Sequence, residues 1–482
     1  MKLTIGMLMI ALLAAGIIPQ TATSRGDLDR TKRPEGKPAP AVRLPEIQKT
    51  TLKNGLTVWL VEQHELPTVA INLVIQSGSD HDPEGKAGLA SMTADMLDEG
   101  TTTRSALQIA EDLESIGATL TTNSSFDGSF VALTTLTKHL DRALAVFTDV
   151  VLHPAFPEKD FERIRKQRLA SLIQQRDQPP AIANNAYAYI LYGASHPYGT
   201  NPAGNEASLN SMTPEELRTF YHSVYLPNNA TLIVVGDVTM SAIVAALETP
   251  MAGWQPGTVS PFTVPDAKAP EAMSVSLIDK PGAAQSEIRI GYPSLSRNTP
   301  DYFPLLVMNR MLGGQFTSRI NLNLRERHGF TYGARSDFAF RKGIGPFTAQ
   351  GGIVTEKTDS AVREFLNEIN LMREKGMTGE ELAYSKKGLV GSFALTFETP
   401  AQIAGRLQDI VLYRLPEDYY NSYLQKIEAV SLDDVQRVAR QYLDASRMAV
   451  VIVGDLSKIR PGVEALNIGK TALCDLDGKP VK

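Results

Sequence analysis

The chain has 482 residues, of which 43% are hydrophobic and 21% are charged, and its formal net charge is −5. This length exceeds what one hydrophobic core serves, so we expect two or more domains. The small negative charge provides no basic surface for nucleic acid, which we exclude as a partner. The single cysteine, Cys474, rules out an intramolecular disulfide.

The first 24 residues have the pattern of a secretory signal peptide. Lys2 precedes an apolar run from Leu3 to Ile18, and small residues follow at positions 22–24. The run is shorter than the roughly 20 apolar residues that span a bilayer, which favours a cleaved signal over a retained anchor. We therefore expect an exported protein, periplasmic in a Gram-negative bacterium, with no stable membrane span after cleavage. Residues 25–44 are predicted to be a disordered leader, because they are rich in Pro, Lys, Arg and Asp.

Helical and strand patterns alternate from residue 45 onward. Residues 50–62 and 68–77 predict two strands paired like a hairpin, and a helix with apolar residues at helical spacing is predicted from Leu89 to Leu97. Farther along, the pattern predicts helices over 105–117, 140–152, 157–175 and 182–192, and strands over 118–125, 129–136 and 229–236.

An internal repeat divides the chain into two halves. Tyr225-Leu226 leads to the apolar strand Thr231–Val238, and Tyr442-Leu443 leads to the similar strand Ala449–Leu456. We therefore predict an α+β fold of two tandem homologous halves, each a unit of mixed helices and antiparallel sheet. The predicted boundaries are a first half over 45–254, a Pro-rich linker over 255–271, a second half over 272–465 and a tail over 466–482.

The segment from Leu312 to Ala334 carries the strongest functional pattern. Gly313 and Gly314 are predicted to end a helix through left-handed backbone, and Gly329 to end a second short helix. A strand then begins, in which Phe330, Tyr332 and Ala334 are expected on one face. Arg325 and Tyr332 stand on either side of this reversal, so their side chains are predicted to converge.

A second motif frames the helix at Leu89. Gly88-Leu89-Ala90 stands before it, and Met96-Leu97 and Gly100-Thr101 follow. With this frame the chain resembles the pitrilysin, insulinase and mitochondrial processing peptidase superfamily of zinc peptidases, from about Leu44 to Ile459. The resemblance implies that the two halves form one half of a clam-shell. It also implies an H-x-x-E-H zinc motif on this helix.

The residues that the resemblance assigns to zinc are missing from this chain. Ser91 and Asp95 stand at the two histidine positions, Ala94 at the general-base glutamate, and Ser171 at or near the distal glutamate ligand. Zinc needs imidazole and carboxylate donors, and an alanine methyl group cannot act as a base. We therefore expect no metal and no other cofactor in this chain.

The resemblance also assigns a role to the opening segment. In the family a segment of this form supplies an arginine and a tyrosine that reach the scissile peptide, and the matching positions here are Arg325 and Tyr332. This implies a zinc-less subunit whose homologous partner carries the zinc motif, acting together on peptide substrates. One alternative is an inactive peptide-binding or assembly module, with extended backbone at 118–125 available to pair with a peptide. The other alternative is a self-sufficient peptidase.

Overall fold

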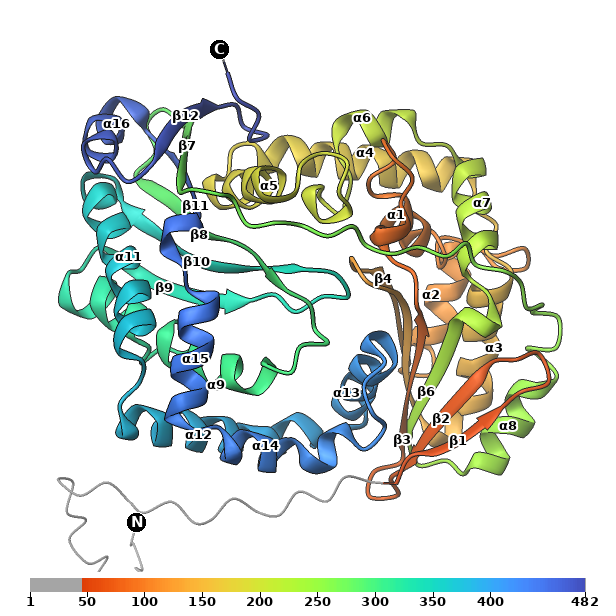
Figure 1. The fold of residues 1–482 in the computed structure, drawn as a ribbon. Coiled ribbons are helices and arrows are strands. Elements are labelled where there is room, and N and C mark those ends of the chain that lie inside the picture. Colours follow the sequence, from red (N-terminus) through yellow and green to blue (C-terminus); the bar gives the residue numbers. More distant parts are fainter. Residues whose placement is uncertain (1–45, 482) are drawn as a thin grey trace, which may run out of the picture. The chain divides into compact units, whose positions relative to one another are not determined.

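Two six-stranded sheets, one from each half of the sequence, organise the chain (Figure 1). The computed structural model describes residues 46–481, which belong to one unit of the chain. The predicted signal peptide and leader, residues 1–44, lie outside the described residues. Within residues 46–481, no helix combines the length and the apolar character needed to cross a membrane.

The first sheet and its helices run from residue 48 to residue 248. The strands are β1 (Gln48–Thr51), β2 (Thr57–Glu62), β3 (Thr68–Ile75), β4 (Thr119–Ser124), β5 (Ser129–Leu136) and β6 (Ala230–Gly236). The helices are α1 (Leu89–Asp95), α2 (Ala106–Glu114), α3 (Leu140–Leu152), α4 (Glu158–Gln175), α5 (Pro179–Tyr192), α6 (Glu206–Ser211), α7 (Pro214–Val224) and α8 (Met240–Glu248).

The second sheet and its helices run from residue 274 to residue 474. The strands are β7 (Ser274–Asp279), β8 (Gln285–Leu295), β9 (Thr331–Phe338), β10 (Gly345–Val354), β11 (Ala449–Gly454) and β12 (Lys470–Cys474). The helices are α9 (Tyr302–Leu312), α10 (Arg319–Asn321), the π-helix η5 (Leu322–Arg327), α11 (Thr358–Lys375), α12 (Gly379–Phe393), α13 (Pro400–Tyr413), α14 (Tyr423–Ala429), α15 (Leu432–Tyr442) and α16 (Leu456–Ala465).

The two sheets have corresponding strand orders, β1-β2-β6-β3-β5-β4 and β12-β7-β11-β8-β10-β9. The strands of the sequence repeat, β6 and β11, each lie third, between a parallel and an antiparallel neighbour. This correspondence confirms the predicted α+β fold of two homologous halves. The sheets are mixed, because β2 and β7 run parallel to the repeat strands.

One local expectation was wrong. β2 and β3 do not pair as a hairpin, because β6 lies between them and pairs with both. All residues of β6 are buried, so this apolar strand occupies the middle of the sheet. The predicted tail contains β12, which runs parallel to β7 and carries the buried Cys474.

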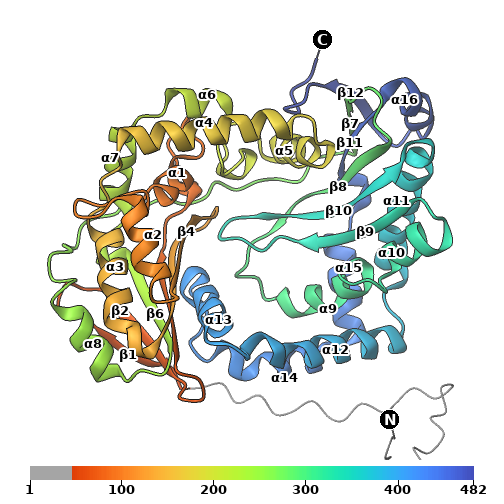
Figure 2. The same ribbon diagram turned by 180° about the vertical axis from the view of Figure 1, so that it is seen from behind.

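Each half also sends one helix to the sheet of the other half, as Figures 1 and 2 show. α13 packs against β3 and β6, where Ile233 and Val235 of β6 face its apolar residues. α5 packs against β8 and β11 in the same way. Asn72 of β3 donates a hydrogen bond to Gln408 of α13 at 2.7 Å. The exchange buries the second face of each central strand, so the two halves share their hydrophobic core.

Candidate functional site

The degenerate zinc motif lies on the short helix α1, whose start is built by a backbone turn and a buried carboxylate. Gly88 precedes the helix with a φ of 91°, a left-handed conformation that favours glycine. The Asp82 carboxylate accepts hydrogen bonds from the backbone N–H groups of Gly88 at 2.8 Å and Ala90 at 2.7 Å. Burial raises the pKa of Asp82 to about 7, although these two donors favour its charged form. The helix that would carry a zinc motif is therefore fully formed.

A guanidinium group links the two positions where the family has histidines. Arg168 of α4 donates hydrogen bonds to Ser91 Oγ at 2.9 Å and to Asp95 Oδ2 at 2.6 Å. It also donates to the carbonyl of Ala203 at 3.3 Å. The Arg168 side chain is only 13% exposed, so this ion pair is partly shielded from water. A fixed cation from the protein thus bridges residues that would face a metal cation in a zinc-binding relative.

The remaining family positions do not fit zinc either. Ala94 is fully buried and has no donor atom, and Ser171 is an exposed residue whose Oγ accepts a hydrogen bond from Gln175. The described part of the chain, residues 46–481, contains no group of three His, Cys, Asp or Glu residues that could hold a metal. Hydroxyl groups are weak zinc ligands, and Arg168 repels a second cation. This donor set disagrees with a zinc site.

The segment with Arg325 has an uncommon helical geometry. The short helix predicted after Gly314 is α10 followed by the π-helix η5, with a hydrogen bond from His328 N–H to the Asn323 carbonyl at 3.1 Å. π-helical turns are rare and are frequent at functional sites. Gly329 follows with a φ of 64°, which confirms the predicted left-handed helix end. The Arg325 guanidinium lies 4.6 Å from the ring centroid of Phe316, a side chain that is 63% exposed.

Tyr332 points in the direction opposite to the prediction. Ala334 is buried, whereas Tyr332 is 88% exposed and does not share its face. The cause is a β-bulge: Ala334 pairs with Gly351 and Thr331 with Ile353, so β9 has one extra residue in this interval. The bulge turns the phenol of Tyr332 outward to solvent.

One side chain holds this bulge in place. Thr331 Oγ1 accepts a hydrogen bond from Gly333 N–H at 3.0 Å. It lies within donating distance of two carbonyl oxygens, that of Gly352 at 2.7 Å and that of Gly333 at 2.9 Å. Buried Asn321 ties the preceding helix to the same strand, because it accepts from Ala334 N–H at 3.1 Å and donates to the Phe316 carbonyl at 2.7 Å. These contacts fix where the segment with Arg325 lies relative to the strand with Tyr332.

The glycine pair before this segment acts differently from the prediction. Gly313 ends α9 with a φ of −156°, which is extended backbone and not the left-handed conformation. A Cβ atom on Gly313 would lie 2.2 Å from Ser336 N, and the carbonyl of Gly313 accepts a hydrogen bond from that N–H. Glycine is needed here because strand β9 approaches the helix end closely.

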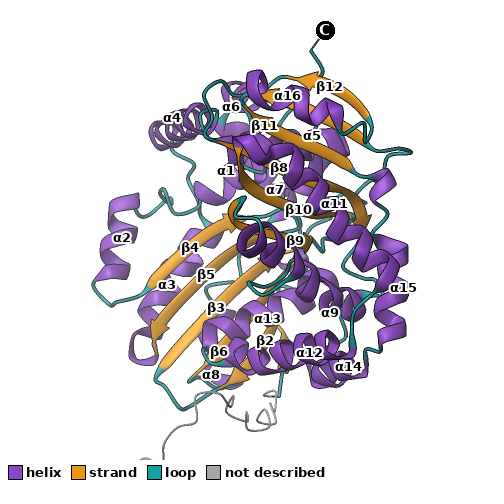
Figure 3. Ribbon diagram, turned by 90° about the vertical axis from the view of Figure 1, so that its left-hand side faces the viewer, coloured by secondary structure: helices purple, strands orange, loops and turns teal. Residues whose placement is uncertain are grey.

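Strands β4 and β9 occupy corresponding edges of the two sheets, and Figure 3 shows β4 at the margin of its sheet. β4 pairs with β5 on one side only, and its side chains alternate between exposed and half-buried positions. An exposed edge of this kind can accept one more strand. β4 lies within the extended segment predicted at 118–125.

The two sheets and the emptied motif define the class of protein: a zinc-peptidase fold without its zinc ligands. Residues 57–194 match the model of the insulinase family, peptidase family M16, and residues 211–389 match the peptidase M16 inactive domain. The chain belongs to this family.

Curated relatives cover most of the chain at low identity. An uncharacterized zinc protease of Bacillus subtilis, YmxG, is 25% identical over 82% of this chain and 95% of the relative. A protein of Helicobacter pylori named non-peptidase homolog YmxG is 24% identical over 82% of this chain and 91% of its own length.

Solved structures share the fold. The peptidase M16 inactive domain from Pseudomonas fluorescens superposes with a TM-score of 0.79 at 27% identity, covering 85% of this chain and 98% of that one. A protease from Helicobacter pylori also has a TM-score of 0.79, at 20% identity, with coverage of 86% and 100%. The second likeness concerns the fold alone.

Proposed function

We propose that this chain is the zinc-less subunit of an exported, heterodimeric metallopeptidase. Its N-terminal half is structural, and its C-terminal half presents Arg325 and Tyr332 to the active site of a homologous subunit that carries the zinc motif. The two halves together would form one half of a clam-shell, closed by the partner. Peptides are the substrates of the assembly.

The observation that carries the proposal is the contrast between the two halves. On α1 an Arg168–Asp95 ion pair stands where zinc ligands would stand, so the N-terminal half is built for a role without metal. In the C-terminal half, the π-helix, the bulge and buried Asn321 fix the segment around Tyr332, whose side chain is exposed. Exposing a tyrosine does not stabilise the fold, so a bulge and a buried asparagine that hold it outward favour a functional role for this segment.

The chemistry of these two residues suits stabilisation of an oxyanion. When water attacks a peptide carbonyl, negative charge develops on the carbonyl oxygen, and aligned donors stabilise it. Tyr332 offers one O–H group, and Arg325 offers several N–H groups and a positive charge. The partner's zinc would supply the activated water. The convergence of both side chains on one peptide group is part of this proposal.

The alternative is a catalytically inactive module that binds peptides or supports an assembly. The match to the M16 inactive domain and the non-peptidase name of the Helicobacter pylori relative support inactivity of the chain alone. The free edge of β4 would serve peptide binding in either case. The alternative predicts that no mixture containing this chain gains peptidase activity.

Co-expression with a zinc-motif homologue tests the proposal. Copurification of both chains and hydrolysis of a quenched fluorescent peptide by the pair, but by neither chain alone, is the expected result. Arg325→Ala should lower kcat/KM, whereas Arg327→Ala is the matched control, because Arg327 is an exposed arginine of the same π-helix. Full activity of the Arg325→Ala pair would refute the role in trans.

A further inference from the structure

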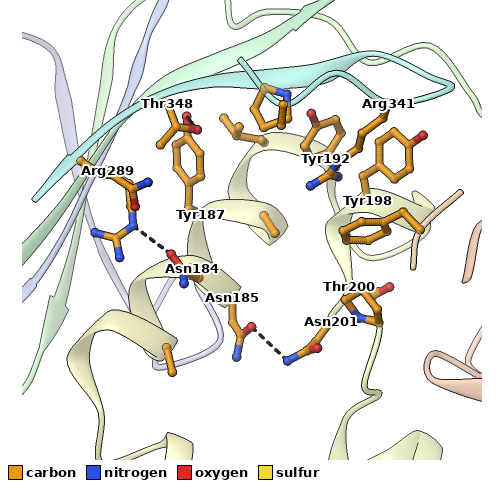
Figure 4. A pocket seen from close by; sticks show the side chains of 18 of the residues that line it. Asn184, Asn185, Tyr187, Tyr192, Tyr198, Thr200, Asn201, Arg289, Arg341 and Thr348 are labelled. Carbon is orange, nitrogen blue, oxygen red and sulfur yellow. Dashed lines mark hydrogen bonds between the residues drawn. The ribbon is translucent and has the colours of Figure 1, made fainter. Parts of the chain in front are cut away.

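A cavity separate from both motifs lies between α5 and the second sheet (Figure 4). Its volume is about 430 Å³, within the range of about 300–1,000 Å³ that is typical of ligand pockets. Its walls come from both halves of the sequence: α5 and the loop at 196–202 on one side, and β8, β9 and β10 on the other. Most lining groups are polar or aromatic, including Asn184, Asn185, Tyr192, Tyr198, Arg289 and Arg341.

One arginine in this cavity has no acidic partner. The Arg341 guanidinium carbon lies 4.0 Å from the ring centroid of Phe126 and 4.6 Å from that of Tyr198. Within residues 46–481 its side chain forms no hydrogen bond or ion pair, and its Nη1 is buried without a partner. Leaving a charged donor unsatisfied is costly, so such a group is expected to bind a ligand atom.

The loop that carries Arg341 is held rigidly. Lys342 N–H donates to Asp127 Oδ2 at 2.9 Å, and Lys342 Nζ donates to the Gln76 carbonyl at 2.7 Å. Gly343 N–H donates to the Tyr198 hydroxyl at 3.0 Å, and the Tyr192 hydroxyl donates to the Ile344 carbonyl at 3.0 Å. Arg341 is therefore preorganised between its two rings, which lowers the entropic cost of binding.

Arg341 is the arginine of the cavity that has no carboxylate paired with it in the described chain. Arg289 is already matched, because its Nη1 lies 2.9 Å from Glu287 and its Nε donates to Asn184 Oδ1 at 2.9 Å. Asp337 is the one carboxyl group among the lining residues; burial raises its pKa, the nearby charges of Arg335 and Arg341 act in the opposite direction, and it forms no ion pair with Arg341 in the described chain. The unmatched cation of the cavity is thus Arg341.

Amide donors line the α5 wall of the cavity. Asn184 Oδ1 is engaged by Arg289, and Asn185 Oδ1 accepts from Asn201 Nδ2 at 3.3 Å. The Nδ2 groups of Asn184 and Asn185 donate to no other described residue, and Figure 4 shows both side chains on the α5 side of the cavity. Amide N–H groups are suitable donors for the carbonyl oxygens of a peptide backbone.

We infer that this cavity binds the carboxyl-terminal end of an extended peptide, with its terminal carboxylate on Arg341 and its last carbonyls on Asn184 and Asn185. Arginine recognises carboxylates well, because its planar guanidinium matches the two carboxylate oxygens. Arg341 lines the cavity, and the rings of Phe126 and Tyr198 lie 4.0 and 4.6 Å from its guanidinium carbon. The inference rests on the proposed action on peptides, but it concerns a binding step that needs no partner subunit.

Calorimetric titration of the purified full chain tests the inference. The probes are N-acetylated hexa-alanine as the free acid, the same peptide amidated at its carboxyl end, and benzoate. The free acid is expected to bind at least about tenfold more tightly than the amide, because a charge-assisted hydrogen bond is lost in the amide. Benzoate, which lacks the peptide carbonyls, is expected to bind more weakly than the free acid.

Two variants and one control locate the contact. Arg341→Gln should abolish the preference for the free acid, whereas Arg335→Gln, which removes an equal charge outside the cavity lining, should retain it. Asn184→Asp keeps the oxygen that accepts from Arg289 and should weaken binding of the free acid by adding a negative charge. Equal binding of free acid and amide by the native chain would overturn the inference, and benzoate as tight as the peptide would overturn the peptide assignment. Because no partner is present, failure here is distinguishable from failure of the role in trans.

Discussion

The hydroxyl of Thr331 is the contact on which the orientation of Tyr332 depends most directly. Thr331→Val retains the shape of the side chain but removes the hydroxyl that accepts from Gly333 N–H and donates to a carbonyl of the bulge. Without it, the extra residue of β9 loses its anchor. We expect the bulge to open and the direction of the Tyr332 phenol to become variable.

The size of the effect follows from the number of bonds lost. The single proton of the hydroxyl serves one carbonyl at a time, so two hydrogen bonds are lost together, one donated and one accepted. Each contributes about 0.5–1.5 kcal/mol net, and Thr331 is only 8% exposed, so water replaces them poorly. Thr331→Val should lower the free energy of unfolding by about 1–3 kcal/mol.

Urea denaturation and amide hydrogen exchange measure both consequences. The unfolding midpoint should fall, and the Gly333 amide should exchange faster in the variant. Thr134→Val is the control, because Thr134 is an exposed threonine in strand β5. Unchanged exchange at Gly333 and a stability equal to that of the control would refute the role of Thr331 in the bulge.

Three further experiments test the N-terminal half. Arg168→Gln should lower the free energy of unfolding by about 1–2 kcal/mol, a value between those of exposed and buried ion pairs. Arg165→Gln, the control on the same helix, should change it by less than about 0.5 kcal/mol. Equal effects of the two substitutions in urea denaturation would contradict the special position of Arg168. Burial raises the pKa of Asp98 to about 6, so the native chain loses stability as pH rises from about 4 through 6. Asp98→Asn should therefore match the native chain at pH 4 and exceed its stability at pH 7.5, and a pH-independent difference would count against this. After dialysis against zinc and desalting, elemental analysis should find well below one zinc per chain, and stoichiometric zinc would contradict the interpretation of Ser91, Ala94 and Asp95.

Local patterns in the sequence predicted the elements that depend on near neighbours. The helix predicted from residue 105 is α2, which Ser105 caps, and Gly329 ends the second short helix as predicted, with left-handed backbone. The two repeated apolar strands of the sequence are β6 and β11, and the structure places each third in its sheet.

Features that depend on distant partners were not predictable in this way. The bulge at Thr331 arises from the register with β10, so the alternation of β9 alone places Tyr332 on the wrong face. The contact between Arg168 and Asp95 spans 73 residues, and nothing near either residue signals it. The exchange of α5 and α13 likewise follows from packing between halves, because an apolar helix face does not specify which sheet covers it.

The hydroxyl of Tyr332 offers the most direct test of the proposed role in trans. In the reconstituted pair with a zinc-motif homologue, Tyr332→Phe removes one oxygen atom from a side chain that is 88% exposed, so the fold and the pairing should persist. Removal of one oxyanion donor typically lowers kcat by about 100- to 1,000-fold. We predict a fall of this order in kcat, with KM changed little and copurification intact. A Tyr332→Phe pair with the kcat of the native pair would contradict the account.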